Sequence, residues 1–271
     1  MDSDFLRQGR GGIVFYECRA LAEIPGVRHG FSTRHGGSGP QSRAALNLGR
    51  VSWDTAENVQ ENRRGFLEAL GLAPASLRTL SQVHSDRVRI IEENSGDWNS
   101  PTRPPEGDGM ITALPAIALG IQVADCFPVL VADPKRGVIA NLHAGWRGTA
   151  ARIAEKGVRT MVARFGCEPA DLRVAIGPGI RSCCFEVGPE VAAAFEAGFP
   201  GAALARPRPG SPGKHLVDLP RALRDQLQTA GVRDRHIFDL GACTRCHLDE
   251  FFSYRGEGPR AGRLMAVIAR S

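Results

Sequence analysis

The sequence lacks any long apolar run. No stretch approaches the roughly 18 uninterrupted apolar residues that a membrane-spanning helix requires. The first residues, MDSDFLRQGRGG, carry acids where a secretory signal has a basic region followed by an apolar one. The seven cysteines are odd in number and accompany no export signal, which indicates reduced thiols rather than a disulfide framework. We therefore expect a soluble, cytoplasmic protein without a membrane partner.

Clustered charge is also missing. The 34 basic and 29 acidic residues leave a net charge of +5 and a pI near 9.0, but no run of five basic residues occurs. We therefore expect no nucleic-acid partner. A weakly positive field would still favour a small anionic substrate such as phosphate.

The length of 271 residues, 42% of them apolar, allows one large α/β domain or two small ones. We favour one catalytic domain over residues 13–271, preceded by a flexible segment at 1–12, and nothing in the sequence demands that the chain be more than a monomer. Strands are predicted at 13–18, 79–83, 88–92, 116–124, 129–132, 138–142, 172–176, 237–240 and 264–269. Helices are predicted at 54–70, 150–165, 189–197 and 218–230, and 206–214 as a disordered insertion. The predicted class is α/β (α+β), a layered domain with mixed β-sheets flanked by helices.

Residues 116–149 combine strand signals, turn signals and candidate metal ligands. Asp133-Pro134-Lys135-Arg136-Gly137 separates two buried strands and predicts a hairpin. A tight closure pairs Asp133 with Arg136 and sets Cys126 opposite His143. A looser closure pairs Asp133 with Val138 and makes Cys126 and His143 diagonal neighbours on the same face.

The hairpin thus offers two ligands for one ion, and His84, just before the strand predicted at 88–92, is the best candidate for a third. Two histidines and a cysteine with an open fourth position are typical of catalytic zinc. None of the compact spacings of known zinc motifs is present. The alternative is that Cys126 is a small buried hydrophobe and each histidine a hydrogen-bonded rim residue.

Several polar residues could complete a site. Asp125 is the stronger candidate for a catalytic acid, although it points away from Cys126 in a strand and could instead orient a ligand. Asp108, between two glycines, is a second candidate. The loop at 31–40, FSTRHGGSGP, could cradle an anion beside Arg34. Arg34 and Arg147 are the candidates for phosphate, because a guanidinium group matches an oxyanion with two hydrogen bonds.

Six cysteines lie outside this region, and four of them form two pairs that are close in the sequence. Cys243-Thr244-Arg245-Cys246-His247 satisfies the C-x-x-C-H pattern of haem attachment and also looks like half a zinc knuckle. Haem is disfavoured because covalent attachment of that kind takes place outside the cytoplasm. Cys183 and Cys184 cannot readily bridge each other, so we expect them in a core or a turn.

Pieces spread over nearly the whole chain resemble the YfiH-like laccase-domain family, whose members are described as multicopper polyphenol oxidase-like and as purine nucleoside phosphorylases. The two most specific pieces are Ala124-Asp125-Cys126-Phe127-Pro128 and His143-Ala144-Gly145-Trp146-Arg147-Gly148. The others are Phe31-Ser32-Thr33-Arg34-His35-Gly36-Gly37, Leu46-Asn47-Leu48-Gly49, Glu61-Asn62-Arg63, Gln82-Val83-His84, Gly107-Asp108-Gly109, Ile176-Gly177-Pro178-Gly179-Ile180, Glu186-Val187-Gly188 and Phe251-Phe252-Ser253-Tyr254-Arg255.

The resemblance implies that His84, Cys126 and His143 bind zinc and that Arg34, Asn47, Gln82, Asp108 and Arg147 contact substrate. It also implies a fold similar to that of YfiH and of the deamidase domain of cytotoxic necrotizing factors. One departure concerns Arg255: the family usually continues with another Arg and an Asp, whereas here Gly256-Glu257-Gly258 follows.

The implied activity is zinc-dependent purine nucleoside phosphorolysis, with adenosine deamination and methylthioadenosine phosphorolysis as further activities of the same site. An alternative is copper-dependent oxidation of phenols. Seven histidines without an H-x-H pair argue against four coppers, although a Cys/His/His site could bind Cu²⁺. A metal-free hydrolase with Cys126 as nucleophile and His143 as base is the other alternative. The H-x-E motif of known zinc deaminases is absent, so Asp125, Asp108 or Glu186 would have to move protons.

Overall fold

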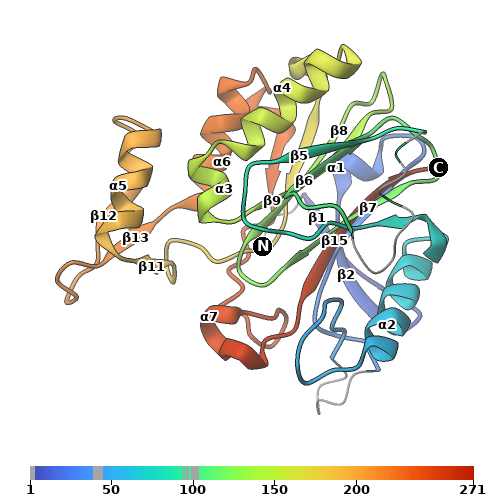
Figure 1. Cartoon of the computed structure of the whole chain (residues 1–271), viewed down its shortest axis with the longest axis horizontal. Helices are drawn as coiled ribbons and strands as arrows, with labels where there is room; N and C mark the ends of the chain where they lie inside the picture. The colour runs from blue at the N-terminus through green and yellow to red at the C-terminus, as the bar shows by residue number, and fades with distance from the viewer. Residues whose placement is uncertain (1–3, 39–44, 94, 96–97, 99–103) are drawn as a thin grey trace.

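The structure, a computed structural model, describes residues 4–38, 45–93, 95, 98 and 104–271. Two six-stranded mixed sheets dominate it, with a three-stranded sheet beside α5 standing to one side (Figure 1). The first sheet has the order β1 (Phe5–Arg10), β2 (Ile13–Cys18), β3 (Val27–Ser32), β15 (Leu264–Arg270), β7 (Ala118–Val123) and β4 (Leu77–Arg78). The second has the order β14 (Ile237–Asp239), β10 (Arg173–Ile176), β8 (Phe127–Ala132), β9 (Ile139–Ala144), β6 (Gly109–Thr112) and β5 (Val88–Ile91).

The third sheet has the order β11 (Glu186–Val187), β13 (His215–Val217) and β12 (Ala205–Pro207). The α-helices are α1 (Arg19–Ala22), α2 (Ala56–Ala69), α3 (Trp146–Ala150), α4 (Ile153–Phe165), α5 (Pro189–Gly198), α6 (Leu219–Thr229) and α7 (Tyr254–Glu257). In the part of the chain described, no helix is long and apolar enough to cross a membrane.

Strand alternation divides the core into layers. In β15, Leu264, Ala266 and Ile268 join the core between the two large sheets, and the residues between them face α2. In β8, Leu130 joins the same inter-sheet core, while Val129 packs toward α4 and α6. The order is therefore helix, sheet, sheet, helix, and the prediction of a layered α/β domain with mixed sheets is confirmed.

The β8–β9 hairpin adopts the looser of the two predicted closures. The N–H of Asp133 donates to the carbonyl of Val138 over 2.8 Å, and Phe127 pairs with Ala144. Gly137 closes the turn with a φ of +68°. Cys126 and His143 are consequently diagonal neighbours on one face rather than directly opposite.

Some predicted boundaries were wrong. Within the segment expected to be flexible at 1–12, of which residues 1–3 lie outside the described part, β1 pairs with β2 as an edge strand. β1 shows little alternation between buried and exposed residues, because Phe5 is its only buried side chain. The strand expected at 79–83 does not form: β4 ends at Arg78, and Ser81 makes only an isolated bridge to Glu106. The segment at 206–214 begins within β12 and continues as the turn that leads to β13, where the N–H of Arg208 donates to the carbonyl of Lys214, instead of being disordered. Residues 39 and 40 of the expected anion loop, and 94, 96, 97 and 99–103 of the connection to Gly107, lie outside the described residues.

The helix predicted at 150–165 is two helices. Arg152 takes a left-handed conformation with a φ of +65°, which separates α3 from α4. Its guanidinium donates to Glu155 and to the carbonyl of Gly198, and these contacts stabilise the break. Thr149 lies within α3, for which Gly145 is the N-cap.

Candidate metal centre and adjoining pocket

The strand order of the second sheet gathers the candidate ligands at one edge. Cys126 precedes the start of β8, His143 lies near the end of the antiparallel β9, and Asp108 immediately precedes β6. His84 comes shortly before β5, which runs parallel to β6. The sheet brings together the starts of β8, β6 and β5 and the end of β9. Residues as far apart in the sequence as His84 and His143, which are 59 positions apart, therefore lie close together.

His84, Cys126 and His143 form a compact group. Their ligand atoms all lie within 4.8 Å of one another. The imidazole rings are edge to face, with centroids 5.0 Å apart. Tetrahedral zinc, with bonds of about 2.0–2.3 Å, separates its ligand atoms by roughly 3.3–3.8 Å. The three ligand atoms would therefore have to move only slightly closer together to bind one ion. The sequence-predicted trio is therefore together, with His84 exposed, Cys126 half-buried and His143 buried.

Asp108 connects two of these ligands. Its Oδ1 lies 2.8 Å from Nδ1 of His143, and its carboxylate accepts hydrogen bonds from the backbone N–H groups of His84 and Ser85. The hydroxyl of Ser85 donates to it as well. An ionised carboxylate only accepts, so Nδ1 of His143 carries the proton and Nε2 faces the cysteine and any ion. Asp108 is fully buried and does not line the cavity described below, and the partners described here for its carboxylate are groups of the protein.

The protonation of the group is strongly biased. Burial would raise the pKa of Cys126, but the neighbouring His143 and His84 outweigh it and lower that pKa to about 6. Burial would lower the pKa of His143, yet the thiolate of Cys126 and the carboxylate of Asp108 raise it to about 9. Burial would likewise raise the pKa of Asp108, but hydrogen bonds from His143 and Ser85 lower it to about 2. Cys126 is thus a thiolate near neutral pH, the form that a metal or an electrophile requires.

The backbone conformation around the ligands allows their side chains to approach one another closely. His84 and Asp125 have positive φ angles, +59° and +88°, which are uncommon for residues other than glycine. A Cβ on Gly145 would lie 3.0 Å from Sγ of Cys126 and 3.1 Å from Cδ2 of His84. Only glycine leaves the two ligands undisturbed at this position, which explains the Gly of the His143-to-Gly148 piece.

A cavity of about 540 Å³ opens onto the three ligands. This volume is typical of a site for a small molecule. Its lining combines apolar, amide and cationic groups: Leu80, Gln82, His84, Gln122, Val123, Ala124, Asp125, Cys126, His143, Ile180, Phe185, Tyr254, Arg255 and Arg263.

Besides Asp108, three of the predicted substrate contacts do not line this cavity. Arg34 is buried, and its guanidinium donates to the carbonyl of Leu248 and pairs with Glu257. Glu257 belongs to the segment in which the sequence departs from the family pattern. Arg147 is exposed, with its guanidinium over the ring of Trp146. The glycine and hydroxyl pattern at 31–38 thus marks a packed turn beside a buried arginine, not an anion site facing the cavity.

Asn47, the third, contacts the cavity only through another residue. It is fully buried, and its Oδ1 accepts the backbone N–H of Arg263, which does line the cavity. Gln82 is at the cavity wall as predicted, but its side-chain amide makes two hydrogen bonds to the backbone of Gln122. Both side chains therefore hold other lining residues in place.

Asp125 lines the cavity with its carboxylate already engaged. Its Oδ1 accepts from the hydroxyls of Thr244 and Ser253 over 2.7 and 2.6 Å, and Oδ2 accepts from the N–H of Arg255 over 2.6 Å. The predicted catalytic acid thus anchors the segment that carries Tyr254 and Arg255.

Sequence reasoning assigned no role to several lining residues: Gln122, Ile180, Phe185, Tyr254, Arg255 and Arg263. Tyr254 is 54% exposed, high for an aromatic side chain, and Arg255 donates to the carbonyl of Glu186. The available signals were two of the pieces that carry the family resemblance, Ile176 to Ile180 and Phe251 to Arg255. Arg263 and Phe185 had none, because they reach the cavity only through the tertiary fold.

Comparison with known proteins agrees with this architecture. Residues 28–271 match the family model described as "Multi-copper polyphenol oxidoreductase laccase". The chain belongs to this family. A relative from Deinococcus radiodurans named "Purine nucleoside phosphorylase" is 40% identical over 243 residues, covering 89% of this chain and 88% of that protein. "Adenosine deaminase RL5", from an unknown prokaryotic organism, is 35% identical over 91% of this chain and 95% of its own length.

A solved structure is also similar to this one. The crystal structure of YlmD from Geobacillus stearothermophilus superimposes with a TM-score of 0.88 at 33% identity, covering 98% of each chain. The predicted resemblance to the YfiH-like laccase-domain family is therefore confirmed.

Proposed function

We propose that this chain is a zinc-dependent purine nucleoside phosphorylase, which also accepts methylthioadenosine. Support comes from relatives that carry the phosphorylase name and from a small-molecule cavity that opens onto a Cys/His/His group. One thiolate and two imidazoles are ligands that zinc favours, and a zinc ion held by His84, Cys126 and His143 would supply Lewis acidity at the cavity floor.

Different side chains of the cavity lining suit phosphate, the purine base and the ribose. Arg255 and Arg263 are the two arginines of this lining, and a guanidinium group binds phosphate through paired hydrogen bonds. Ile180, Phe185 and Tyr254 offer apolar and aromatic surface on which a purine base can stack. Gln122 has an amide that can hydrogen-bond to a base or a ribose hydroxyl.

The carboxylates favour phosphorolysis over deamination. Asp125 is the one carboxylate in the cavity lining, and it accepts three hydrogen bonds from the protein. Glu186 pairs with Arg208 outside this cavity. Deamination by known zinc enzymes needs a free glutamate beside the metal to move protons, whereas phosphate is already an anionic nucleophile. This is the single observation that carries the choice.

Multicopper oxidation receives less support despite the family description. All seven histidines lie in described residues, and only His84 and His143 belong to a cluster of candidate metal ligands there. A centre of several coppers needs many more imidazoles than two. The same Cys/His/His group could take one Cu²⁺, because copper binds most ligand sets more tightly than zinc.

A nucleoside screen tests the proposal. Purified protein is assayed with adenosine, inosine, guanosine and methylthioadenosine, with and without inorganic phosphate, and base, ribose 1-phosphate and ammonia are quantified. Free base formed only with phosphate supports phosphorolysis. Ammonia without phosphate indicates deamination. Activity that survives strong chelation but not thiol alkylation indicates a metal-free cysteine hydrolase.

A further inference from the structure

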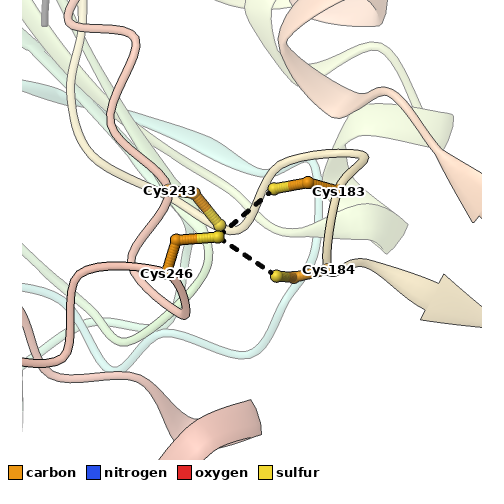
Figure 2. A group of neighbouring side chains, drawn as sticks. All are labelled: Cys183, Cys184, Cys243 and Cys246. Carbon is orange, nitrogen blue, oxygen red and sulfur yellow. Dashed lines mark hydrogen bonds between the residues drawn. The ribbon is translucent and has the colours of Figure 1, made fainter.

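A second group of potential ligands lies away from the Cys/His/His centre. Cys183 and Cys184 lie in the turn before β11, and Cys243 and Cys246 lie in the segment after β14. The four sulfur atoms are all within 4.8 Å of one another, and Figure 2 shows the two pairs directed toward each other across the gap between their loops. Sγ of Cys246 is 3.6 Å from that of Cys183 and 3.4 Å from that of Cys184.

These separations match four sulfurs around a single ion. Tetrahedral zinc with bonds of about 2.3 Å spaces its sulfur ligands roughly 3.8 Å apart. A disulfide would need about 2.05 Å, and all four cysteines are free thiols. An iron–sulfur cluster binds its cysteines through different iron atoms and therefore spreads their sulfurs further apart than one ion does.

We propose that Cys183, Cys184, Cys243 and Cys246 form a closed tetrathiolate zinc site, separate from the centre at Cys126. Four protein ligands leave no position for substrate, which is typical of structural zinc. The spacing of Cys243 and Cys246 is that of a zinc knuckle, and the adjacent pair Cys183 and Cys184 supplies the other half.

The charges around the four sulfurs favour a metal ion bound by four thiolates. The cavity beside the sulfurs is lined by Arg208, Arg245 and Arg255 and by one acid, Glu186, so two positive charges are in excess. Zinc with four thiolates carries two negative charges, which these arginines would balance. The backbone N–H of Arg181 lies 3.5 Å from Sγ of Cys243 and donates to it, an outer contact that stabilises a thiolate ligand.

The site would join two loops that form the wall of the nucleoside-sized cavity. Phe185 follows Cys184 directly and lines that cavity. Thr244 follows Cys243 and donates to Asp125, which in turn holds Arg255. Without the ion, the described links between the loops include the Gly179–Cys243 bridge and the hydrogen bond from Arg255 to the carbonyl of Glu186. The second zinc would therefore fix the cavity wall and take no part in chemistry.

Metal analysis of the full chain, purified without chelator, tests this inference. We expect two zinc ions per chain in the wild type, one in Cys126→Ala, and one in the double variant Cys183→Ser/Cys246→Ser. Cys167→Ala, which removes a buried thiol outside both groups, keeps two. One zinc in the wild type that the double variant retains would overturn the proposal. Iron in place of zinc, or a mass two daltons low from a disulfide, would overturn it as well.

Cobalt keeps the test decisive if the double variant does not fold. Cys126→Ala retains all four cysteines, so Co²⁺ added to it after zinc removal should give the intense thiolate-to-cobalt absorption of a tetrahedral sulfur site. The single variant Cys184→Ser should weaken that absorption, and Cys167→Ala in the same background should not. Absence of the absorption in folded Cys126→Ala contradicts the proposal. The outcome does not depend on whether the protein cleaves nucleosides.

Discussion

Nδ1 of His143 lies 2.8 Å from Oδ1 of Asp108, and the backbone N–H of His143 also donates to the carbonyl of Asp108 over 2.6 Å. The same carboxylate accepts the backbone N–H of His84. One buried acid thus sets the ring orientation of one candidate ligand and the backbone of another. Partners of this kind tune metal affinity as strongly as many direct contacts do.

Asp108→Asn tests this role. The Asp108 carboxylate accepts hydrogen bonds from several N–H groups, whereas the amide of Asn would place its own N–H groups against some of these donors. The ring of His143 and the loop at His84 should therefore lose their fixed orientation. We expect zinc affinity at the Cys126 centre to fall about 10–100-fold, measured by competition with a chromophoric chelator. Asp86→Asn, at a half-exposed residue paired with Lys156, is the matched control. A folded Asp108→Asn protein with wild-type affinity would contradict the role.

Gly145→Ala tests the close packing of the ligands. The added methyl group would sit 3.0 Å from Sγ of Cys126 and 3.1 Å from the ring of His84, so both must shift by a few tenths of an ångström. We expect zinc affinity and catalytic efficiency to fall roughly tenfold or more, with circular dichroism unchanged. Gly9→Ala has no neighbour within 4 Å and should behave as the wild type. Equal activity in both variants would mean that the ligands need not approach this closely.

Arg255→Gln tests the assignment of phosphate. Removing a charged donor from the cavity should raise the KM for phosphate about 10–100-fold, because hydrogen bonds to charged groups contribute about 1.5–3 kcal/mol. The KM for nucleoside should change much less. Arg260→Gln, an exposed arginine nearby that does not line the cavity, is the control. Equal effects on both substrates would point instead to collapse of the cavity wall.

His29 predicts a pH dependence of stability. It is 1% exposed and accepts the N–H of Cys18 through Nε2, and burial lowers its pKa to about 4 from the ordinary 6.5. Between these values the unfolded chain binds more protons than the folded one, so stability is complete above pH 6.5 and falls as pH drops toward 4. The loss attributable to His29 is about 3 kcal/mol.

Urea unfolding at pH 7.5, 5.5 and 4.5 measures this dependence. His29→Gln can still accept the Cys18 hydrogen bond but does not titrate, so its stability should decline less over the same range than that of the wild type. His247→Gln, at an exposed histidine, should follow the wild type. Parallel curves for all three proteins would rule out the contribution of His29.

The sequence predicted the parts of the fold and site that local chemistry determines. The Thr55 N-cap begins α2, and Gly71, with a φ of +73°, follows its end. Both closures of the β8–β9 hairpin kept Cys126 and His143 on one face, so their convergence did not depend on which closure formed. These features follow from turn chemistry and period-two alternation.

Features set by distant pairing could not be predicted in the same way. The role of Asp108 follows from the pairing of Gly109 with Leu142, and no local pattern specifies that β6 lies beside β9. Cys183 and Cys246 meet across 63 positions for the same reason. Arg34 was assigned to phosphate because its loop has the composition of an anion site, but burial against the segment at 248–257 decides its partners.

The most direct test of the central claim is the release of purine base from inosine and adenosine by zinc-containing protein, measured by chromatography with and without phosphate, in the wild type and in Cys126→Ala. We predict base and ribose 1-phosphate in equal amounts, only with phosphate and only in the wild type. Base release that needs no phosphate, or that persists in Cys126→Ala, would contradict a phosphorylase built on His84, Cys126 and His143.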